Sequence, residues 1–434
     1  MIGALSVLAA LLYCFPWLRP PEIGGVAFPA QRLIAWAGLA VLLSHLVLKG
    51  SLATGTAAWG FLRVAALFTV FLLLILVWQL AYGENFFPLY YFMDLSKYAA
   101  AFAMAYLCYY ALSNGLVTEQ RFVRSLLLSG TLGTFVVFLL LALYFAGFRT
   151  ENEILAPSFG GSLGVWPTEG WLPRLAGPTA EPQQLSVVLL TPLLLMLSPQ
   201  HIRRRWPIAL ATGTALFLSQ SKFAVISLMF VLLFLFLSYA RWRRLIIIGA
   251  LAVSPALLFA LIQLPTFAAT LEAGLSAGAF VERLGNLLLL LTIVREHPFL
   301  GIGPGQYGVY WGQAIHGDVY KSPGYTPNMD FLKVFAETGA AGFALILFLL
   351  GFLIRLFARA YRVLSSEERP YYAAFFLGAL AIMLNMTIGY ELLHAFFWIN
   401  IGALLSKVDQ NRSDESLPES TQIPAHLEFG PATR

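Results

Sequence analysis

The chain has 434 residues, of which 59% are hydrophobic and 11% are charged, and its formal net charge at pH 7 is +5. An ordinary soluble domain carries about 25% charged residues, so this composition excludes a soluble globular protein and makes the lipid bilayer the solvent for most of the chain. We therefore expect an all-α polytopic membrane protein. A net charge this small for the length is no sign of nucleic-acid binding, and no nucleic acid is expected among the partners.

Segments apolar enough to span a bilayer recur along the chain, because a spanning helix needs about 20 mostly apolar residues. The sequence predicts about twelve such transmembrane helices, over residues 2–18, 31–48, 61–81, 97–113, 123–147, 183–199, 206–220, 223–239, 245–263, 331–355, 371–389 and 391–406. The first lacks a charged region followed by a small-residue cleavage site, so we expect a first span and not a removed signal. The prediction is a transmembrane domain over residues 1–406 and a polar, disordered cytoplasmic tail over residues 407–434.

The distribution of basic residues predicts the orientation of these spans. If the N-terminus is cytoplasmic, the cytoplasmic connections and the tail hold 17 of the 27 Lys and Arg residues, including the triplet Arg203–Arg205. The positive-inside rule requires this bias. Two connections on the periplasmic side are then long, one over residues 148–182 and the other, between spans 9 and 10, over residues 264–328. We expect function to reside there, since functional residues concentrate in long structured loops.

Seven basic residues remain at or near the outer ends of spans, against this charge bias. They are Arg149, Arg174, Lys222, Arg283, Arg295, Lys321 and Lys333. Snorkelling to the headgroups or ion pairing with nearby glutamates explains any one of them. For the whole set, an outward-facing anion-binding cavity is the better account. A pyrophosphate suits such a cavity, because arginine offers a planar fork for bidentate phosphate contact.

Two segments place particular charged residues. After Arg174, a Gly-Pro turn puts Arg174 and Glu181 near the start of a helix, and a capped helix start with one ion pair explains the same residues. Residues 278–298 read as one helix that carries Arg283 near its beginning and Arg295 near its end. These two arginines are about 120° apart around the helix axis, so they need not share one ligand.

The segment HPFLGIGPGQYGVYWGQ, residues 297–313, interrupts the apolar chain with glycines and two prolines. Glycine permits backbone angles and close approaches that other residues resist, so this loop approaches either a ligand or a neighbouring helix. Gly303 and Gly305 are therefore candidate substrate-binding residues. Tyr307 begins an aromatic stretch that either stacks on sugar rings or marks the membrane interface.

The segment Asn328–Gly339 opens the tenth predicted span. Asn328 is a favourable N-cap residue, and Asp330 suits the positive end of the helix dipole. Asp330, Lys333 and Glu337 lie within about 60° of one another around the helix. A charged stripe that enters the membrane is costly, so these residues should face the cavity and not lipid.

The glycine loop His-Pro-Phe-Leu-Gly-Ile-Gly-Pro-Gly-Gln-Tyr and the later motif Asn-Met-Asp-Phe-Leu-Lys-Val-Phe-Ala-Glu-Thr-Gly-Ala-Ala-Gly resemble the O-antigen ligase and O-antigen polymerase superfamily. The resemblance implies a polytopic fold grouped with the integral-membrane, type C glycosyltransferases, with a large periplasmic loop before the late spans. It also implies transfer of a glycan from a polyprenyl-pyrophosphate carrier to an acceptor sugar, at the periplasmic face of the bacterial inner membrane. Ligases use lipid A-core as the acceptor, and polymerases use another carrier-linked repeat unit.

The resemblance assigns roles to particular residues. Arg283 is similar to the family arginine before the glycine loop, Ser-Gln-Ser-Lys at 219–222 is similar to a family Ser-x-Ser-Arg, and Arg174 is similar to a polymerase arginine. These cations, with Lys222 in place of an arginine, are expected to hold the pyrophosphate. Ligases commonly have His-Asn where this chain has Pro327-Asn328, and that histidine is their proposed base, so the difference favours a polymerase. His316 could substitute from the loop, although a loop histidine is more often solvated.

The expected reaction is an inverting transfer in which the cations stabilise the departing pyrophosphate while a base orients the acceptor hydroxyl. The candidate catalytic residues are Arg283, Arg174, Lys222, Glu181, Asp330 and His316, with Glu337 as a further candidate base. The candidate substrate-binding residues are Arg295, Gly303, Gly305, Tyr307, Asn328, Lys333 and Glu337. No cofactor or essential metal is expected, since no ligand cluster has metal spacing. The partners are the lipid-linked donor and acceptor, the bilayer and, from the resemblance, a chain-length regulator protein.

A flippase that moves the same lipid-linked glycan is the rival class, because about twelve spans fit either protein. A flippase would favour charges along a central path reachable from both sides, together with a two-fold internal repeat. The sequence has no such repeat, and its charges are asymmetric. An enzyme is therefore the favoured class, either a polymerase or, as the alternative, a ligase.

Overall fold

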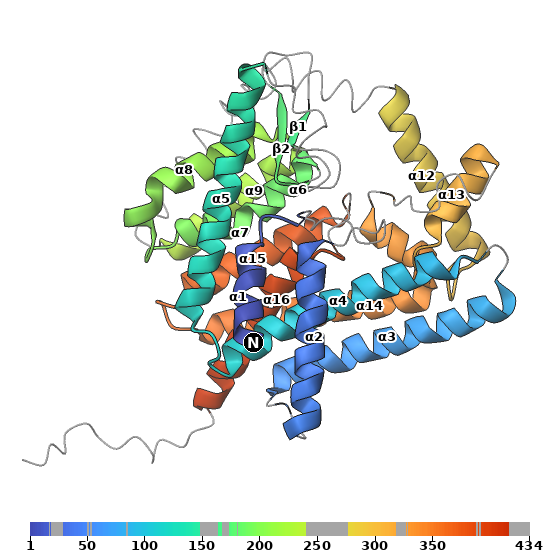
Figure 1. The fold of residues 1–434 in the computed structure, drawn as a ribbon, viewed down its shortest axis with the longest axis horizontal. Helices are drawn as coiled ribbons and strands as arrows, with labels where there is room; N and C mark the ends of the chain where they lie inside the picture. The colour runs from blue at the N-terminus through green and yellow to red at the C-terminus, as the bar shows by residue number, and fades with distance from the viewer. Residues whose placement is uncertain are drawn as a thin grey trace, which may run out of the picture.

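The structure is a computed structural model that is mostly helical, with one two-stranded antiparallel sheet among the described residues (Figure 1). It describes residues 1–16, 18, 29–49, 52, 54–83, 86–147, 164–166, 173–179, 181–239, 277–317, 327, 329–387, 389 and 392–415. In a bilayer only helices and closed barrels satisfy every backbone group, so this helix content suits the apolar composition.

The helices follow one another along the chain with short connections in most places. The first half contains α1 (Ile2–Leu11), α2 (Ala30–Lys49), α3 (Thr56–Tyr82), α4 (Pro88–Ser113), α5 (Glu119–Phe145), α6 (Pro182–Val188), α7 (Leu190–Met196), α8 (Ile202–Leu218) and α9 (Lys222–Ser238). The second half contains α12 (Ala277–Glu296), α13 (Tyr307–His316), α14 (Asp330–Val363), α15 (Arg369–Asn385) and α16 (Ala395–Glu415). Strands β1 (Gly164–Trp166) and β2 (Arg174–Gly177) pair before α6.

Helices occur in all the predicted spans except residues 245–263, which lie outside the described residues. The boundaries differ in places: α1 ends at Leu11, and the span predicted over 183–199 is two short helices that meet at Leu189. Four described helices are long and apolar enough to cross a membrane, namely residues 30–48, 56–82, 119–145 and 330–363. These helices support a membrane protein, and the number of spans stays a prediction.

Two parallel helices, α4 and α16, form the centre of the bundle. The rings of Phe102 and Trp398 meet edge to face with centroids 5.0 Å apart, and farther along the Gln410 side-chain amide donates to the Leu112 carbonyl at 3.4 Å. Both helices therefore run in the same direction. Figure 1 shows α2 and α3 beside this centre, the α5–α9 group on the other side, and α12 and α13 against α14.

The bundle has two chemically different ends, which we call the Lys407 end and the Asp330 end. At the Lys407 end, the Lys407 ammonium pairs with Glu119 at 3.3 Å and with Glu368 at 2.7 Å. From Glu368, α15 runs to the other end, where the Asp330 backbone N–H donates to the Gly389 carbonyl at 2.9 Å. The antiparallel neighbour α9 ends near the start of α15, because the turn that follows α7 contacts both. The Tyr239 hydroxyl donates to the Leu197 carbonyl of this turn at 2.6 Å, and the Gln200 amide of the turn donates to the Glu367 carbonyl at 3.3 Å.

A carboxylate of α16 caps the start of α3. The Ala57 and Ala58 backbone N–H groups donate to the two Asp409 carboxylate oxygens at 2.8 and 3.2 Å. The Gly55 backbone N–H donates to the Tyr109 hydroxyl of α4 at 2.6 Å. These bonds satisfy backbone donors that have no partner within a helix. Helix α16 continues to Glu415, beyond the predicted tail boundary at residue 406.

We predict that Asp409→Ala lowers the free energy of unfolding by about 1–2 kcal/mol, because it removes a cap from buried backbone donors. Asp409→Asn keeps one oxygen acceptor and should cost less. Glu119→Ala is the control, since Glu119 is 45% exposed and an exposed ion pair contributes at most about 1 kcal/mol. Thermal unfolding in detergent measures all three variants, and equal midpoints for Asp409→Ala and Glu119→Ala would contradict the cap.

Candidate functional site

The glycine loop and the first part of α14 form one hydrogen-bonded unit. Helix α14 breaks at Gly339, whose φ is 64° and ψ −172°. On one side of the break, the Ile302 and Gly303 backbone N–H groups donate to the Ala336 and Glu337 carbonyls at 3.1 and 2.8 Å. On the other side, the Ala340 and Ala341 backbone N–H groups donate to the Pro298 and Phe299 carbonyls at 2.8 and 3.4 Å. The loop thus supplies the partners that the broken helix lacks.

Glycine is required at two places in this unit. Gly301 has φ 67°, and a Cβ there would lie 2.6 Å from the Ala336 carbonyl oxygen. A Cβ at Gly339 would lie 2.5 Å from the Leu300 backbone nitrogen. Real Cβ atoms do not approach other atoms so closely, so any side chain would separate the loop from the helix. Of the two partners that the sequence left open for the loop, a ligand or a helix, the structure supplies the helix.

The loop is also fixed to the segment that precedes α4. The Phe87 backbone N–H donates to the Gln306 side-chain oxygen at 2.9 Å, and the Gln306 amide returns a bond to the Phe87 carbonyl at 3.0 Å. The Gln79 amide of α3 donates to the Gly301 carbonyl at 3.3 Å. Gly303 packs beneath the Tyr91 ring, and Gly305 lies against the Tyr90 carbonyl. Both glycines therefore face α4, and a contact with substrate stays a prediction for them.

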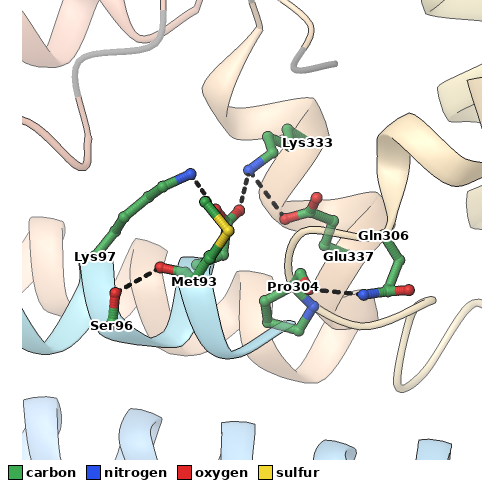
Figure 2. A network of polar contacts seen from close by, with 8 residues as sticks. Met93, Ser96, Lys97, Pro304, Gln306, Lys333 and Glu337 are labelled. Carbon is green, nitrogen blue, oxygen red and sulfur yellow. Dashed lines mark hydrogen bonds and ion pairs between the residues drawn. The ribbon is translucent and has the colours of Figure 1, made fainter. Parts of the chain in front are cut away.

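Next to the loop lies a buried network of four charged side chains from α4 and α14. The Lys333 ammonium pairs with Asp94 at 2.7 Å and with Glu337 at 3.2 Å, and Asp94 also pairs with Lys97. Figure 2 shows Lys333 between Lys97 of α4 and Glu337, with Pro304 and Gln306 of the loop beside Glu337. Lys333 is 4% exposed, Glu337 0% and Lys97 24%. Only Lys97 opens this network to its surroundings.

Glu337 has little hydrogen bonding besides its ion pair. Neither of its oxygens accepts a full hydrogen bond from the described residues, and the Gly305 backbone amide adds a weaker electrostatic interaction. A buried charge is costly unless it is paired, so the Lys333 ammonium is the main group that offsets the cost of burying the Glu337 carboxylate. Lys333 and Glu337 lie on one buried face of α14, as the sequence predicts for charges kept out of lipid. The cavity expected beside them stays a prediction. Direct contact with a sugar stays a prediction for both.

Asp330 anchors the start of α14 to the segment between α15 and α16. Its carboxylate accepts a hydrogen bond from the Leu392 backbone N–H at 2.7 Å. The helix begins at Asp330 with Met329 in the cap position, so the predicted cap at Asn328 was wrong by one residue. The start of α14 has no side-chain cap and is held by contacts with the distant residues Gly389 and Leu392, which no local pattern in the sequence shows. Asn328 itself lies outside the described residues.

Two segments that carry candidate residues meet where β2, α6, α8 and α9 converge. The Gln220 side-chain amide donates to the Pro173 carbonyl at 3.4 Å, which brings the Ser219–Lys222 turn beside the strand that begins at Arg174. Gln220 has φ 46°, an uncommon value for a residue with a side chain. The Ser219 and Ser186 hydroxyls are 2.9 Å apart and fix the turn to α6.

The predicted turn after Arg174 is present, and it leads into α6 at Pro182. Glu181 stands immediately before this helix, where its carboxylate accepts a bond from the Gln183 amide at 2.5 Å. Arg174 and Glu181 are both partly exposed. The side chains of Lys222, Arg283 and His316 lie outside the described parts, so the prediction that Arg174, Lys222 and Arg283 share a pocket stays a prediction.

The remaining candidates lie on α12 and α13. The predicted helix with Arg283 and Arg295 is α12, which packs on α14. Arg295 is exposed in its last turn. Tyr307 is buried, donates to the Asn286 side-chain oxygen at 2.7 Å and stacks on Trp311. A role in sugar binding stays a prediction for Tyr307, whose described contacts are structural.

Sequence reasoning missed Asp94 and Lys97. Both lie in the apolar helix α4, three residues apart, and the predicted span was begun at residue 97, which left Asp94 outside it. A signal was available, because ionisable residues inside a spanning helix almost always face other charges or a polar cavity.

Comparison with protein families gives a match over part of the chain. Residues 207–347 match the family model described as O-Antigen ligase. The matched region contains the Ser219–Lys222 turn, α12, the glycine loop and the start of α14. It confirms the resemblance that the loop and helix motifs carry, and it does not separate polymerases from ligases. No curated protein matches the chain.

We predict that Gly339→Ala destabilises the protein and lowers its activity, because alanine at positive φ costs about 1–2 kcal/mol and its Cβ overlaps the loop backbone. Gly351→Ala is the matched control in the same helix, where a Cβ meets no atom within 4 Å. That control should be neutral or more stable by up to about 1 kcal/mol. Unfolding midpoints in detergent compare the two variants, and equal midpoints would show that the loop is not packed as described.

We predict that Lys333→Met destabilises the protein by about 3–5 kcal/mol, because it leaves Glu337 buried without a countercharge. Lys407→Met is the control, since its partners Glu119 and Glu368 are at least 36% exposed and the expected cost is about 1 kcal/mol or less. Adding Glu337→Gln to Lys333→Met should recover part of the loss. A double-mutant cycle without coupling between Lys333 and Glu337 would exclude the pair as a stabilising contact.

Proposed function

We propose that this chain, a member of the O-antigen ligase and polymerase superfamily, is a membrane glycosyltransferase that polymerises polyprenyl-pyrophosphate-linked oligosaccharide repeat units. The product would be an O-antigen or an exopolysaccharide, made on the periplasmic face of the inner membrane. The observation that carries the proposal is the position of the family match. It covers the turn with Lys222, the helix with Arg283, the glycine loop and the charged start of α14.

The reaction needs a good leaving group and an oriented acceptor. The acceptor hydroxyl oxygen bonds to the anomeric carbon of the donor sugar, while the bond from that carbon to the diphosphate oxygen breaks. The diphosphate leaves with the bonding electrons, and the hydroxyl proton passes to a base. Fixed cations at the departing oxygens stabilise the charge that develops. In this proposal Arg174, Lys222 and Arg283 supply those cations. The Gln220–Pro173 hydrogen bond holds the segment of Arg174 beside the turn that contains Lys222.

Glu181 is the base that we favour among the four candidates. It is partly exposed and lies on the same segment as Arg174. Glu337 is buried against Lys333, and the Asp330 carboxylate holds the Leu392 backbone N–H. A base must reach the proton that it accepts, which favours the accessible carboxylate.

A ligase is the second candidate, because the matched family is described as O-Antigen ligase. Ligases commonly have a histidine at the position where this chain has Pro327, and Pro327 is buried. A polymerase is therefore the proposal that we retain. The two enzymes differ only in the acceptor, so the acceptor is what an experiment must vary.

The test uses the purified full chain in proteoliposomes with carrier-linked repeat units, with and without lipid A-core. A ladder of longer carrier-linked glycans without lipid A-core supports the polymerase. Glycan joined only to lipid A-core identifies a ligase. Movement of the lipid-linked glycan across the bilayer without any new glycosidic bond identifies a transporter and overturns the proposal.

We predict that Arg174→Gln and Arg283→Ala each lower the rate of glycan joining by about 10²-fold or more, as expected for a lost donor at a developing negative charge. Arg203→Gln, at the Lys407 end, is the matched arginine control and should keep the wild-type rate. Product ladders at equal protein level measure the effect. Wild-type chain lengths in the Arg174 or Arg283 variant would remove that residue from the site.

A further inference from the structure

The Lys407 end of the bundle contains a pocket that lies away from the candidate site. Residues of α4, α5, α15 and α16 line it, among them the apolar side chains of Leu112, Phe122 and Phe375 and the charged side chains of Glu119 and Lys407. We call it the Lys407 pocket. Its volume is about 40 Å³, whereas one water needs about 10–15 Å³. A group the size of a phosphate therefore fits inside.

Two carboxylates share one ammonium at the mouth of this pocket. The Lys407 ammonium pairs with Glu119 at 3.3 Å and with Glu368 at 2.7 Å, and these glutamate side chains are 45% and 36% exposed. The guanidinium of the neighbouring Arg369 donates to backbone carbonyls instead. A carboxylate has lone pairs for more than one donor. The mouth therefore has a surplus negative charge and can bind a second cation without displacing Lys407.

Two hydroxyl groups that line the pocket have no hydrogen-bond partner among the described residues. They belong to Tyr371, which is 9% exposed, and Ser406, which is 2% exposed. The adjacent Tyr372 differs, because its hydroxyl donates to the Phe357 carbonyl at 3.1 Å. Leaving a buried polar group unpaired is costly. The Tyr371 and Ser406 hydroxyls are therefore donors that a bound ligand would satisfy.

The carboxylates and the hydroxyls are close together along two helices. Ser406 directly precedes Lys407 in α16. In α15 the Tyr371 backbone N–H donates to the Glu368 carbonyl at 3.1 Å, so Tyr371 lies one turn farther along the helix than Glu368. The carboxylates of Glu119 and Glu368 are more exposed than these hydroxyl-bearing residues. The pocket thus has acceptors at its rim and hydroxyl donors farther in.

The Lys407 pocket lies at an end of a helix that can span a bilayer. Glu119 is the first residue of α5, which is among the described helices long and apolar enough to cross a membrane. The sequence predicts that this end is cytoplasmic. The ends of spanning helices lie among lipid headgroups, and pockets between helices at this side are able to bind them. A headgroup is therefore the ligand nearest to the pocket.

We propose that the Lys407 pocket binds the headgroup of phosphatidylethanolamine, a zwitterionic phospholipid with a primary ammonium. The lipid ammonium donates to the Glu119 and Glu368 carboxylates at the rim, and the lipid phosphate accepts hydrogen bonds from the Tyr371 and Ser406 hydroxyls. Lys407 keeps both of its ion pairs. The site goes beyond the proposed function, because it lies at the end of the bundle opposite Asp330 and its occupation needs no glycan.

Other membrane lipids match this arrangement less well. Phosphatidylglycerol has no ammonium, and its net negative charge meets the surplus carboxylate at the rim. Phosphatidylcholine has the same phosphate, but its quaternary ammonium has no N–H group to donate to a carboxylate. The apolar side chains of Leu112, Phe122 and Phe375 favour a lipid over a free headgroup, because they offer contact to the glycerol and the first methylene groups.

The test titrates the purified full chain, freed of lipid in detergent, with these three lipids carrying identical acyl chains. Native mass spectrometry measures the affinities, and phosphatidylethanolamine should bind at least about tenfold more tightly than the other two. Glu119→Gln and Tyr371→Phe should each weaken it about tenfold. Glu367→Gln and Tyr144→Phe are the matched controls and should bind as wild type, since Glu367 does not line the pocket and Tyr144 lies at the other end of α5.

Three results would overturn the proposal. Equal binding of the three lipids to wild type would make the pocket an unselective apolar gap. Wild-type affinity for phosphatidylethanolamine in Glu119→Gln, whose exposed position tolerates the change, would remove the rim from the site. Glycerophosphoethanolamine, the same headgroup without acyl chains, should bind at least about tenfold more weakly, and equal affinity would assign the pocket to a soluble ligand. If Tyr371→Phe does not fold, Ser406→Ala serves in its place.

Discussion

The hydrogen bonds between the glycine loop and the broken helix α14 are the constraint on which the candidate site depends. A break inside a spanning helix leaves backbone N–H and C=O groups unpaired, and each costs several kcal/mol in a bilayer. Residues 298–303 supply the missing donors and acceptors on both sides of Gly339. The two motifs that carry the family resemblance are therefore one structural unit. Their glycines are needed because one backbone packs directly against another.

The break also determines where the charges of α14 lie. The first part of the helix carries Lys333 and Glu337 against Asp94 of α4, directly beside Gly305 of the loop. Since Gly301 and Gly339 allow the loop to approach this closely, the loop closes the network from one side. The buried ion pairs and the loop thus stabilise each other: the pairs fix α14 against α4, and the loop keeps water away from Glu337. Within this network, Lys97 is the one side chain that stays partly accessible.

Local features of the chain were predicted well, and contacts between distant segments were not. Helix positions follow from runs of apolar residues, so α2, α3, α5 and α9 lie close to the predicted spans. Asp94 lies outside the predicted span, which began at residue 97, whereas α4 begins at Pro88. Its partner Lys333 lies 239 residues away, and only the folded chain brings the two together. The meeting of the Ser219–Lys222 turn with the strand of Arg174 is likewise a product of packing, for which neither segment carries a local signal.

Gln220 shows how a strained residue can hold two distant segments together. A residue with a side chain at positive φ costs about 1–2 kcal/mol, and it persists only where the surroundings compensate. Here the side-chain amide of Gln220 bonds the carbonyl before Arg174, and the Ser219 hydroxyl bonds Ser186. The strained turn therefore aligns the start of α9 with β2, the two elements that carry Lys222 and Arg174. The proposed transfer relies on fixed cations around a leaving group, and it would depend on such supporting residues, because charge that is already oriented need not reorganise during the reaction.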